Sequence, residues 1–174
     1  MKRLLSILIL SALALGARAQ GNIPLLDKVQ GQRVTFQYTY SLSQKGAPFT
    51  PVTEGKVTVE DNAYILQGLG MEVVSNGTTR WTLDREAREA MVEKVVAEDL
   101  FTNPALFIGS YKNYLDRIQV NSSGSDSLDV TLTLDAETKT RFVLRDIVFL
   151  PREGKSDFSL DEKSLSGYLI TDLR

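Results

Sequence analysis

The side chains that could carry out chemistry in this sequence are carboxylates, because its 174 residues include no His and no Cys. This composition excludes Ser-His-Asp triads, Cys–His nucleophiles, thiol redox pairs and typical structural zinc sites. The acidic candidates for a paired site are Glu98 with Asp99, Asp61 and Asp157. None has the spacing signature of a calcium loop or of a glycosidase pair, so we interpret them as solvated surface groups. We expect no enzymatic activity, no metal site and no cofactor.

The first 19 residues have the pattern of a secretory signal peptide. Lys2 and Arg3 precede an apolar run over residues 4–15, and Ala17 and Ala19 provide small residues at a cleavage site. A run of about 12 residues is shorter than the roughly 20 that a membrane-spanning helix needs. We therefore predict cleavage after Ala19, export to the periplasm, and a single mature domain over residues 20–174. The formal charge of −2 for the whole chain offers no basic excess that would attract a nucleic acid.

Alternation of apolar and polar residues predicts that the mature chain is mostly β-strand. The longest example covers residues 34–42, where apolar side chains occupy every second position. The dipeptide Asn76-Gly77 predicts a tight hairpin between two further strands. The other predicted strands are 57–59, 64–66, 71–74, 79–83, 115–120, 128–134, 141–145, a short strand at Phe158 and Leu160, and 168–173.

Two segments favour short helices, and one segment is ambiguous. Ile23, Leu25, Leu26 and Val29 would share one face of a helix near the mature N-terminus. Asn103-Pro104 would open a second, apolar helix over residues 105–111. Between residues 84 and 100, composition favours a helix, whereas the pattern also fits a turn at 84–87 followed by a strand at 89–94.

These elements predict a mainly β domain of nine or ten antiparallel strands with two helical segments. A sheet of that many strands tends to curl or to close. Its concave apolar face must then be covered by the helices, by a ligand, or by both.

Four segments in this order resemble the LolA-like periplasmic carriers of outer-membrane lipoproteins, in particular the branch typical of Bacteroidetes. They are the hairpin VVSNGTTRWTLD at 73–84, the stretch GKVTVEDNAY at 55–64, Asn103-Pro104 before an apolar helix, and the terminal segment 158–174, which ends in Asp-Leu-Arg. The resemblance spans nearly all of the mature chain.

The resemblance implies a half-open antiparallel β-barrel with helices that cover its concave face, and it favours a strand at residues 89–94. It implies a soluble, monomeric periplasmic chaperone that carries lipoprotein acyl chains from the inner to the outer membrane. Its partners would be an inner-membrane lipoprotein-releasing ABC transporter and an outer-membrane acceptor. Carriers of this family hold their lid shut with an Arg on an early strand, and the matching residues 64–67 here contain no Arg.

Strand phase and the candidate helix give the residues expected to line an apolar cavity. They are Phe36, Tyr38, Tyr40, Trp81, Leu83, Leu106, Phe107, Ile108 and Phe149, the last in a connection before Pro151. The alternative is that these side chains are ordinary core. Two other functions stay open: a periplasmic protein that binds a different lipid or hydrophobic ligand, and a secreted domain that only contacts another protein.

Overall fold

The computed structural model describes residues 22–95, 101–154 and 156–174. The predicted signal peptide at 1–19 and the pair Glu98 and Asp99 lie outside these ranges. None of the helices within the ranges has the length and apolar character needed to cross a membrane.

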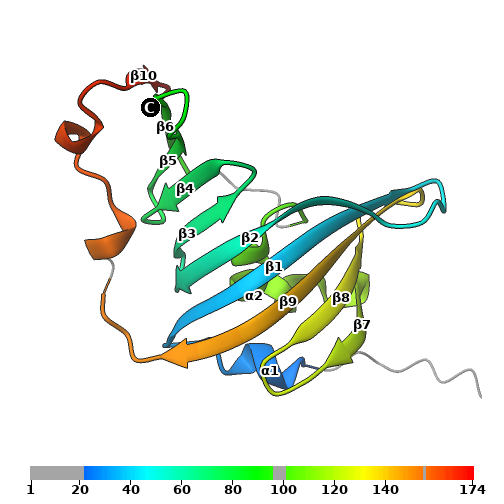
Figure 1. Ribbon diagram of the computed structural model, residues 1–174. Coiled ribbons are helices and arrows are strands. Elements are labelled where there is room, and N and C mark those ends of the chain that lie inside the picture. Colours follow the sequence, from blue (N-terminus) through cyan, green and yellow to red (C-terminus); the bar gives the residue numbers. More distant parts are fainter. Residues whose placement is uncertain (1–21, 96–100, 155) are drawn as a thin grey trace, which may run out of the picture.

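Within these ranges, ten strands form one mixed sheet that is not closed (Figure 1). The strands are β1 (Arg33–Gln44), β2 (Thr50–Glu60), β3 (Ala63–Gly68), β4 (Met71–Ser75), β5 (Thr79–Asp84), β6 (Glu89–Lys94), β7 (Ile118–Ser123), β8 (Leu128–Thr133), β9 (Thr138–Leu150) and β10 (Leu169–Asp172). Their order across the sheet is β10-β6-β5-β4-β3-β2-β1-β9-β8-β7. The prediction of a mainly β protein is confirmed. The prediction of a wholly antiparallel sheet is wrong at one edge, because β10 pairs parallel to β6.

The ambiguous segment contains a strand, β6, which follows a turn after Asp84 and pairs with β5. The two predicted helices are present as α1 (Pro24–Asp27) and α2 (Pro104–Ser110). The described residues also form three 3₁₀ helices: η1 (Tyr111–Arg117), η2 (Ser156–Phe158) and η3 (Glu162–Leu165). The predicted strand at Phe158 and Leu160 is wrong, since Phe158 ends η2 with its ring fully buried.

One face of the sheet, called the inner face here, carries the main core. Directly opposed residues of paired strands share a face, so Phe36 and Val57 extend into one row with Leu66. Side chains from α1, α2 and η1 pack against this face around β1, β2, β8 and β9. In Figure 1, α2 lies behind β1 and β2, and α1 lies below them.

The opposite, outer face carries a second and smaller core over β4, β5 and β6. It is made of Val74, Trp81, Leu83, Ala90, Val92 and Leu165. Leu165 comes from the segment that follows β9, which we call the C-terminal strap (residues 151–154 and 156–168). The strap leaves the end of β9, passes beside β3–β5 and delivers β10 to the far edge of the sheet (Figure 1).

A buried ion-pair cluster fastens the start of the strap to the sheet. Arg33 and Glu60 are register partners on β1 and β2, and the Arg33 Nε donates to the Glu60 carboxylate at 3.1 Å. The same guanidinium donates to Glu153 at 2.7 Å, to Asp157 at 2.8 Å and to the Gly154 carbonyl at 2.8 Å. Burial alone would raise the pKa of Glu60, but bonds from the Glu153 and Gly154 backbone N–H groups and from Arg33 hold it below its ordinary value. The cluster therefore keeps the Glu60 carboxylate charged inside the fold.

Candidate functional site

Helix α2 is the element that covers the centre of the inner face. Its start is fixed by the Asn103 side chain, whose Oδ1 accepts from the backbone N–H groups of Ala105 at 2.9 Å and Leu106 at 3.3 Å. Pro104 occupies the first helical turn, where a missing N–H costs nothing. This start directs Phe107 and Ile108 onto the sheet, where both are buried.

The centre of the inner face is filled by aromatic packing. The ring centroid of Phe107 lies 5.5 Å from that of Phe142 on β9. Phe142 lies equally close, at 5.5 Å, to the ring of Tyr40 on β1. Tilted pairs at this distance are favourable contacts of a packed core. The space under α2 that a ligand could occupy is therefore at the edge of the core and not at its centre.

A cavity of about 490 Å³ lies at that edge, between α1, α2 and the β2–β3 hairpin. Its wall is built by apolar side chains from all three elements: Leu26, Val29, Val59, Tyr64, Ala105, Leu106 and Ile108. Polar residues of the hairpin turn and of the helix ends complete the lining: Asp27, Gln30, Asp61, Asn62, Ser110, Lys112 and Asn113. An apolar wall with polar groups at the margin is the usual construction of a site for a small apolar ligand.

One carboxylate ties α1 to η1, the 3₁₀ helix that directly follows α2, beside the cavity. Asp27, at the end of α1, accepts the Tyr111 hydroxyl at 2.7 Å and pairs with the Lys112 ammonium at 2.7 Å. The hydrogen bond from Lys112 is the main reason that the pKa of Asp27 is lowered, and Tyr111 adds to it. Burial, followed by the bond to Asp27, raises the pKa of Tyr111 to about 12.

We expect Tyr111→Phe to weaken this tie and to make the stability of the fold less sensitive to alkaline pH. The folded chain holds the Tyr111 proton more tightly than the unfolded chain, in which the pKa is near 10.0. The stability that results is complete below pH 10.0 and is lost as the pH rises toward about 12. Thermal unfolding should show a Tm lower by about 3 °C at neutral pH. The decline of Tm in alkali should also be shallower in the variant, and an unchanged alkaline profile would contradict this assignment.

Beyond the helices, the inner face of the sheet carries further apolar side chains, and these are less buried. The row that starts with the buried Phe36 and Val57 continues through Leu66 and Val73, and then through Thr82 to Met91. Leu66, Val73 and Met91 are only half-buried, whereas Val57 is fully buried. The half-covered part of the row lies over β3, β4 and β6.

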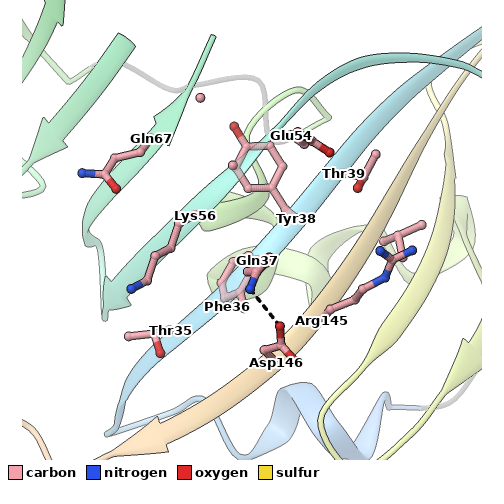
Figure 2. Close-up of a pocket in the computed structure, with 13 residues that line it drawn as sticks. Thr35, Phe36, Gln37, Tyr38, Thr39, Glu54, Lys56, Gln67, Arg145 and Asp146 are labelled. Carbon is pink, nitrogen blue, oxygen red and sulfur yellow. Dashed lines mark hydrogen bonds between the residues drawn. The ribbon is translucent and has the colours of Figure 1, made fainter. Parts of the chain in front are cut away.

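A second, larger hollow of about 640 Å³ lies on the outer face and has a different character (Figure 2). Exposed polar side chains from β1, β2, β3 and β9 surround it, among them Gln37, Lys56 and Gln67. Gln37 donates to the Asp146 carboxylate at 2.9 Å, as Figure 2 shows. Fewer of the residues that line this groove are apolar, so the cavity between α1 and α2 is the better candidate for an apolar ligand.

The structure brings seven of the nine predicted lining residues together in the main core. They are Phe36, Tyr38, Tyr40, Leu106, Phe107, Ile108 and Phe149. Only Leu106 and Ile108 line the cavity between the helices. Phe36 and Tyr38 adjoin the outer groove, although both side chains are nearly fully buried. Phe149 lies within β9 and not in a connection.

Trp81 and Leu83 do not belong with the other seven. Trp81 opposes Val74, and Val74 opposes Ile65, so the three share the outer face. Both Trp81 and Leu83 pack in the second core, beneath the strap. The alternation along one strand shows which of its residues share a face. Only the pairing with neighbouring strands shows whether that face is the inner or the outer face of the sheet.

Four residues that line the cavity were not predicted from the sequence as site residues: Leu26, Val29, Val59 and Tyr64. The apolar face of α1 was visible in the sequence and contributes Leu26 and Val29. Val59 and Tyr64 are register partners across the β2–β3 hairpin, which places both side chains beneath the helices. The apolar face of α1 could therefore have been used to predict Leu26 and Val29 as lining residues. The position of Val59 and Tyr64 could be known only from the pairing register of β2 with β3.

Comparison with known proteins gave no relative: no protein-family model matches this chain, and neither does any curated protein.

Proposed function

We propose that the protein is an exported carrier that holds acyl chains of lipoproteins between its covering helices and the inner face of its sheet. The observation that carries this proposal is the cavity of about 490 Å³ with an apolar wall between α1, α2 and the β2–β3 hairpin. In this proposal the unclosed sheet is a half-open barrel of the LolA-like kind, and α1 and α2 are its lid.

The energetics of lipid transfer explain why such a cavity is useful. Burial of each methylene is worth about 0.8 kcal/mol, so three chains of about 15 methylenes are held in a bilayer by roughly 36 kcal/mol. A lipoprotein cannot cross an aqueous compartment against such a cost without a carrier. An inner-membrane ABC transporter would supply the energy for extraction, and an outer-membrane acceptor would receive the cargo.

Release requires that the carrier bind hydrocarbon without anchoring it firmly. The cavity meets this requirement because its wall makes apolar contacts, which are not directional. The half-covered row of Leu66, Val73 and Met91 gives long chains a way to extend beyond the cavity. Opening of the helices would need the tie of Asp27 to Tyr111 and Lys112 to break.

We expect Leu106→Ala to weaken hydrocarbon binding about tenfold. Leu106 is half-buried and lines the cavity, and loss of its apolar contacts with a ligand should cost about 1.4 kcal/mol of binding free energy. The measurement is a titration of delipidated protein with cis-parinaric acid, a fluorescent straight-chain fatty acid. Val148→Ala is the matched control, because Val148 is an exposed aliphatic residue of β9 that does not line the cavity. Equal affinities for the two variants would contradict the placement of the ligand.

A second candidate is a carrier for a single-tailed lipid. The cavity volume falls within the range of about 300–1,000 Å³ that is usual for small ligands, which favours one tail over three. Inner-membrane vesicles that contain a triacylated protein and its transporter separate the two candidates. A lipoprotein carrier will release the acylated protein into solution, whereas a single-tail carrier will bind cis-parinaric acid and release no protein.

A further inference from the structure

The two edges of the sheet are built differently. The edge strand β7 is short and turns polar after Val120, and its pairing with β8 is interrupted by a register shift between Val120 and Ser122. Bulges and polar side chains of this kind discourage pairing with another chain.

The opposite edge, β10, is shorter still, but its pairing with β6 has no register shift and two of its four side chains, those of Leu169 and Ile170, are apolar. All four of its residues are exposed, and within the described part of the chain no further strand lies beyond it (Figure 1). Leu169 is 68% exposed, Ile170 41% and Leu173 60%. These are three of the seven large apolar residues that are exposed in the described ranges, gathered within five positions.

The backbone of β10 directs a second set of hydrogen-bonding groups away from the sheet. The N–H groups of Leu169 and Leu173 donate to the carbonyls of Arg88 and Val92, each at 2.8 Å. Alternate residues of a strand bond to the same neighbour. Ile170 and Asp172 therefore present their N–H and C=O groups to the open edge.

We propose that β10 pairs antiparallel with β10 of a second copy of this chain, about a twofold axis at Thr171. In this register Ile170 opposes Asp172 of the second copy, and each such pair exchanges two backbone hydrogen bonds. Leu169 opposes Leu173 of the second copy, in the pair type whose side chains approach most closely.

The sequence of β10 fits a second copy at the positions whose side chains approach most closely. Twofold symmetry places one contact between Leu169 and Leu173 on each side of a central Thr–Thr pair. The charge of Asp172 is already balanced by Arg174, which donates to it through both its backbone and its guanidinium. Ile170 therefore does not meet an unpaired carboxylate.

The contact is short, so the dimer is weak. Stable interfaces bury about 1,200–2,000 Å² in total, and a single pair of four-residue strands is far smaller than a usual interface. Association should therefore depend on concentration, with the chain monomeric when dilute and increasingly dimeric toward about 1 mM.

Sedimentation velocity of the purified protein over this concentration range tests the proposal. We expect Ile170→Pro to weaken association by about tenfold or more, because it removes an N–H that points to the open edge. The variant leaves the N–H groups that bond to β6 in place. Ile170→Val is the matched control and should behave as the parent does. A monomer at every concentration would overturn the proposal, and so would a dimer that Ile170→Pro leaves unchanged.

A pair of double variants tests the register even if a proline at position 170 disturbs β10. The variant with Leu169→Lys and Leu173→Lys places like charges opposite each other and should remain monomeric. The variant with Leu169→Glu and Leu173→Lys places opposite charges there and should dimerise more than the first. Circular dichroism and the fluorescence of Trp81, the only tryptophan, will report whether each variant is folded. Equal association of the two variants would contradict the antiparallel register.

Discussion

Gly55→Ala will lower the free energy of unfolding by about 4 kcal/mol, or will prevent folding. A Cβ atom on Gly55 would overlap the backbone carbonyl oxygen of Gln67 on the neighbouring strand β3. Because the obstacle is main chain, no rotation of a side chain can relieve it. Gly55 opposes Gly68 in the β2–β3 pair, and a Cβ atom on Gly68 would lie only 2.5 Å from the Tyr38 hydroxyl. The β2–β3 hairpin, which forms one wall of the cavity, therefore requires a glycine at position 55.

Urea unfolding followed by circular dichroism measures this effect. Gly109→Ala in α2 is the matched control, since the nearest atom to its new Cβ would be the Asp61 carbonyl oxygen at an ordinary 3.6 Å. An alanine in a helix is favoured over glycine by about 0.5–1 kcal/mol, so the control should be neutral or stabilising. Similar losses of stability in both variants would show that the sheet does not depend on the close approach at Gly55.

Arg33→Met will cost about 3 kcal/mol of stability, because it leaves the fully buried Glu60 carboxylate with only the more distant guanidinium of Arg152, whose Nε lies 3.6 Å from it. The same substitution removes the bonds from Arg33 to Glu153, Gly154 and Asp157, which fix the start of the strap. Urea unfolding monitored by Trp81, which lies beneath the strap, should show both the lower midpoint and any early loosening of the second core.

When Glu60→Gln is added to the Arg33→Met variant, it should restore about 2 kcal/mol of the lost free energy of unfolding. The neutral amide oxygen can still accept from one of the Glu153 and Gly154 backbone N–H groups, which bond to different oxygens of Glu60, and the cost of a buried charge that lacks a close partner is removed. Arg85→Met is the control for an exposed pair: its partner is Glu72, and its loss should cost less than about 1 kcal/mol. If Arg33→Met costs no more than Arg85→Met, the buried cluster does not anchor the strap.

Local patterns in the sequence were sufficient for most elements. The alternation after Arg33 predicts β1, and Asn76-Gly77 predicts the β4–β5 hairpin, in which the Asn76 side chain accepts from the Thr79 N–H at 2.8 Å. Asn103-Pro104 predicts α2, whose first turn the Asn103 side chain caps. Each of these signals depends on residues that are close in the chain.

Features that depend on distant residues could not be predicted. In β9 the buried positions change phase at Asp146, which has a positive φ of 53°, so the alternation ends before the strand does and Phe149 reads as part of a connection. The parallel pairing of β10 depends on the path of the strap around the sheet. The pairing of Arg33 with Glu60 depends on a register between residues 27 positions apart.

The candidate site was predicted only in part, because it too depends on contacts between residues that are distant in the sequence. The sequence identified Leu106 and Ile108 through the apolar helix, and the structure places both at the cavity. Phe107 and Tyr40 were candidates for the cavity lining, with ordinary core packing as the alternative, and both pack against Phe142 and fill the centre of the inner face. Whether a group of apolar side chains encloses a cavity depends on packing that strand phase does not contain.

The identity of the molecule bound between α1 and α2 tests the proposed function most directly. The measurement is native mass spectrometry of the protein, isolated without detergent from the compartment in which cells hold it. We predict that an acylated polypeptide is bound to one copy of the chain, and that Leu106→Ala reduces its occupancy whereas Val148→Ala does not. A protein that carries only free lipid, or that carries no acyl-bearing molecule, would contradict the proposal of a lipoprotein carrier.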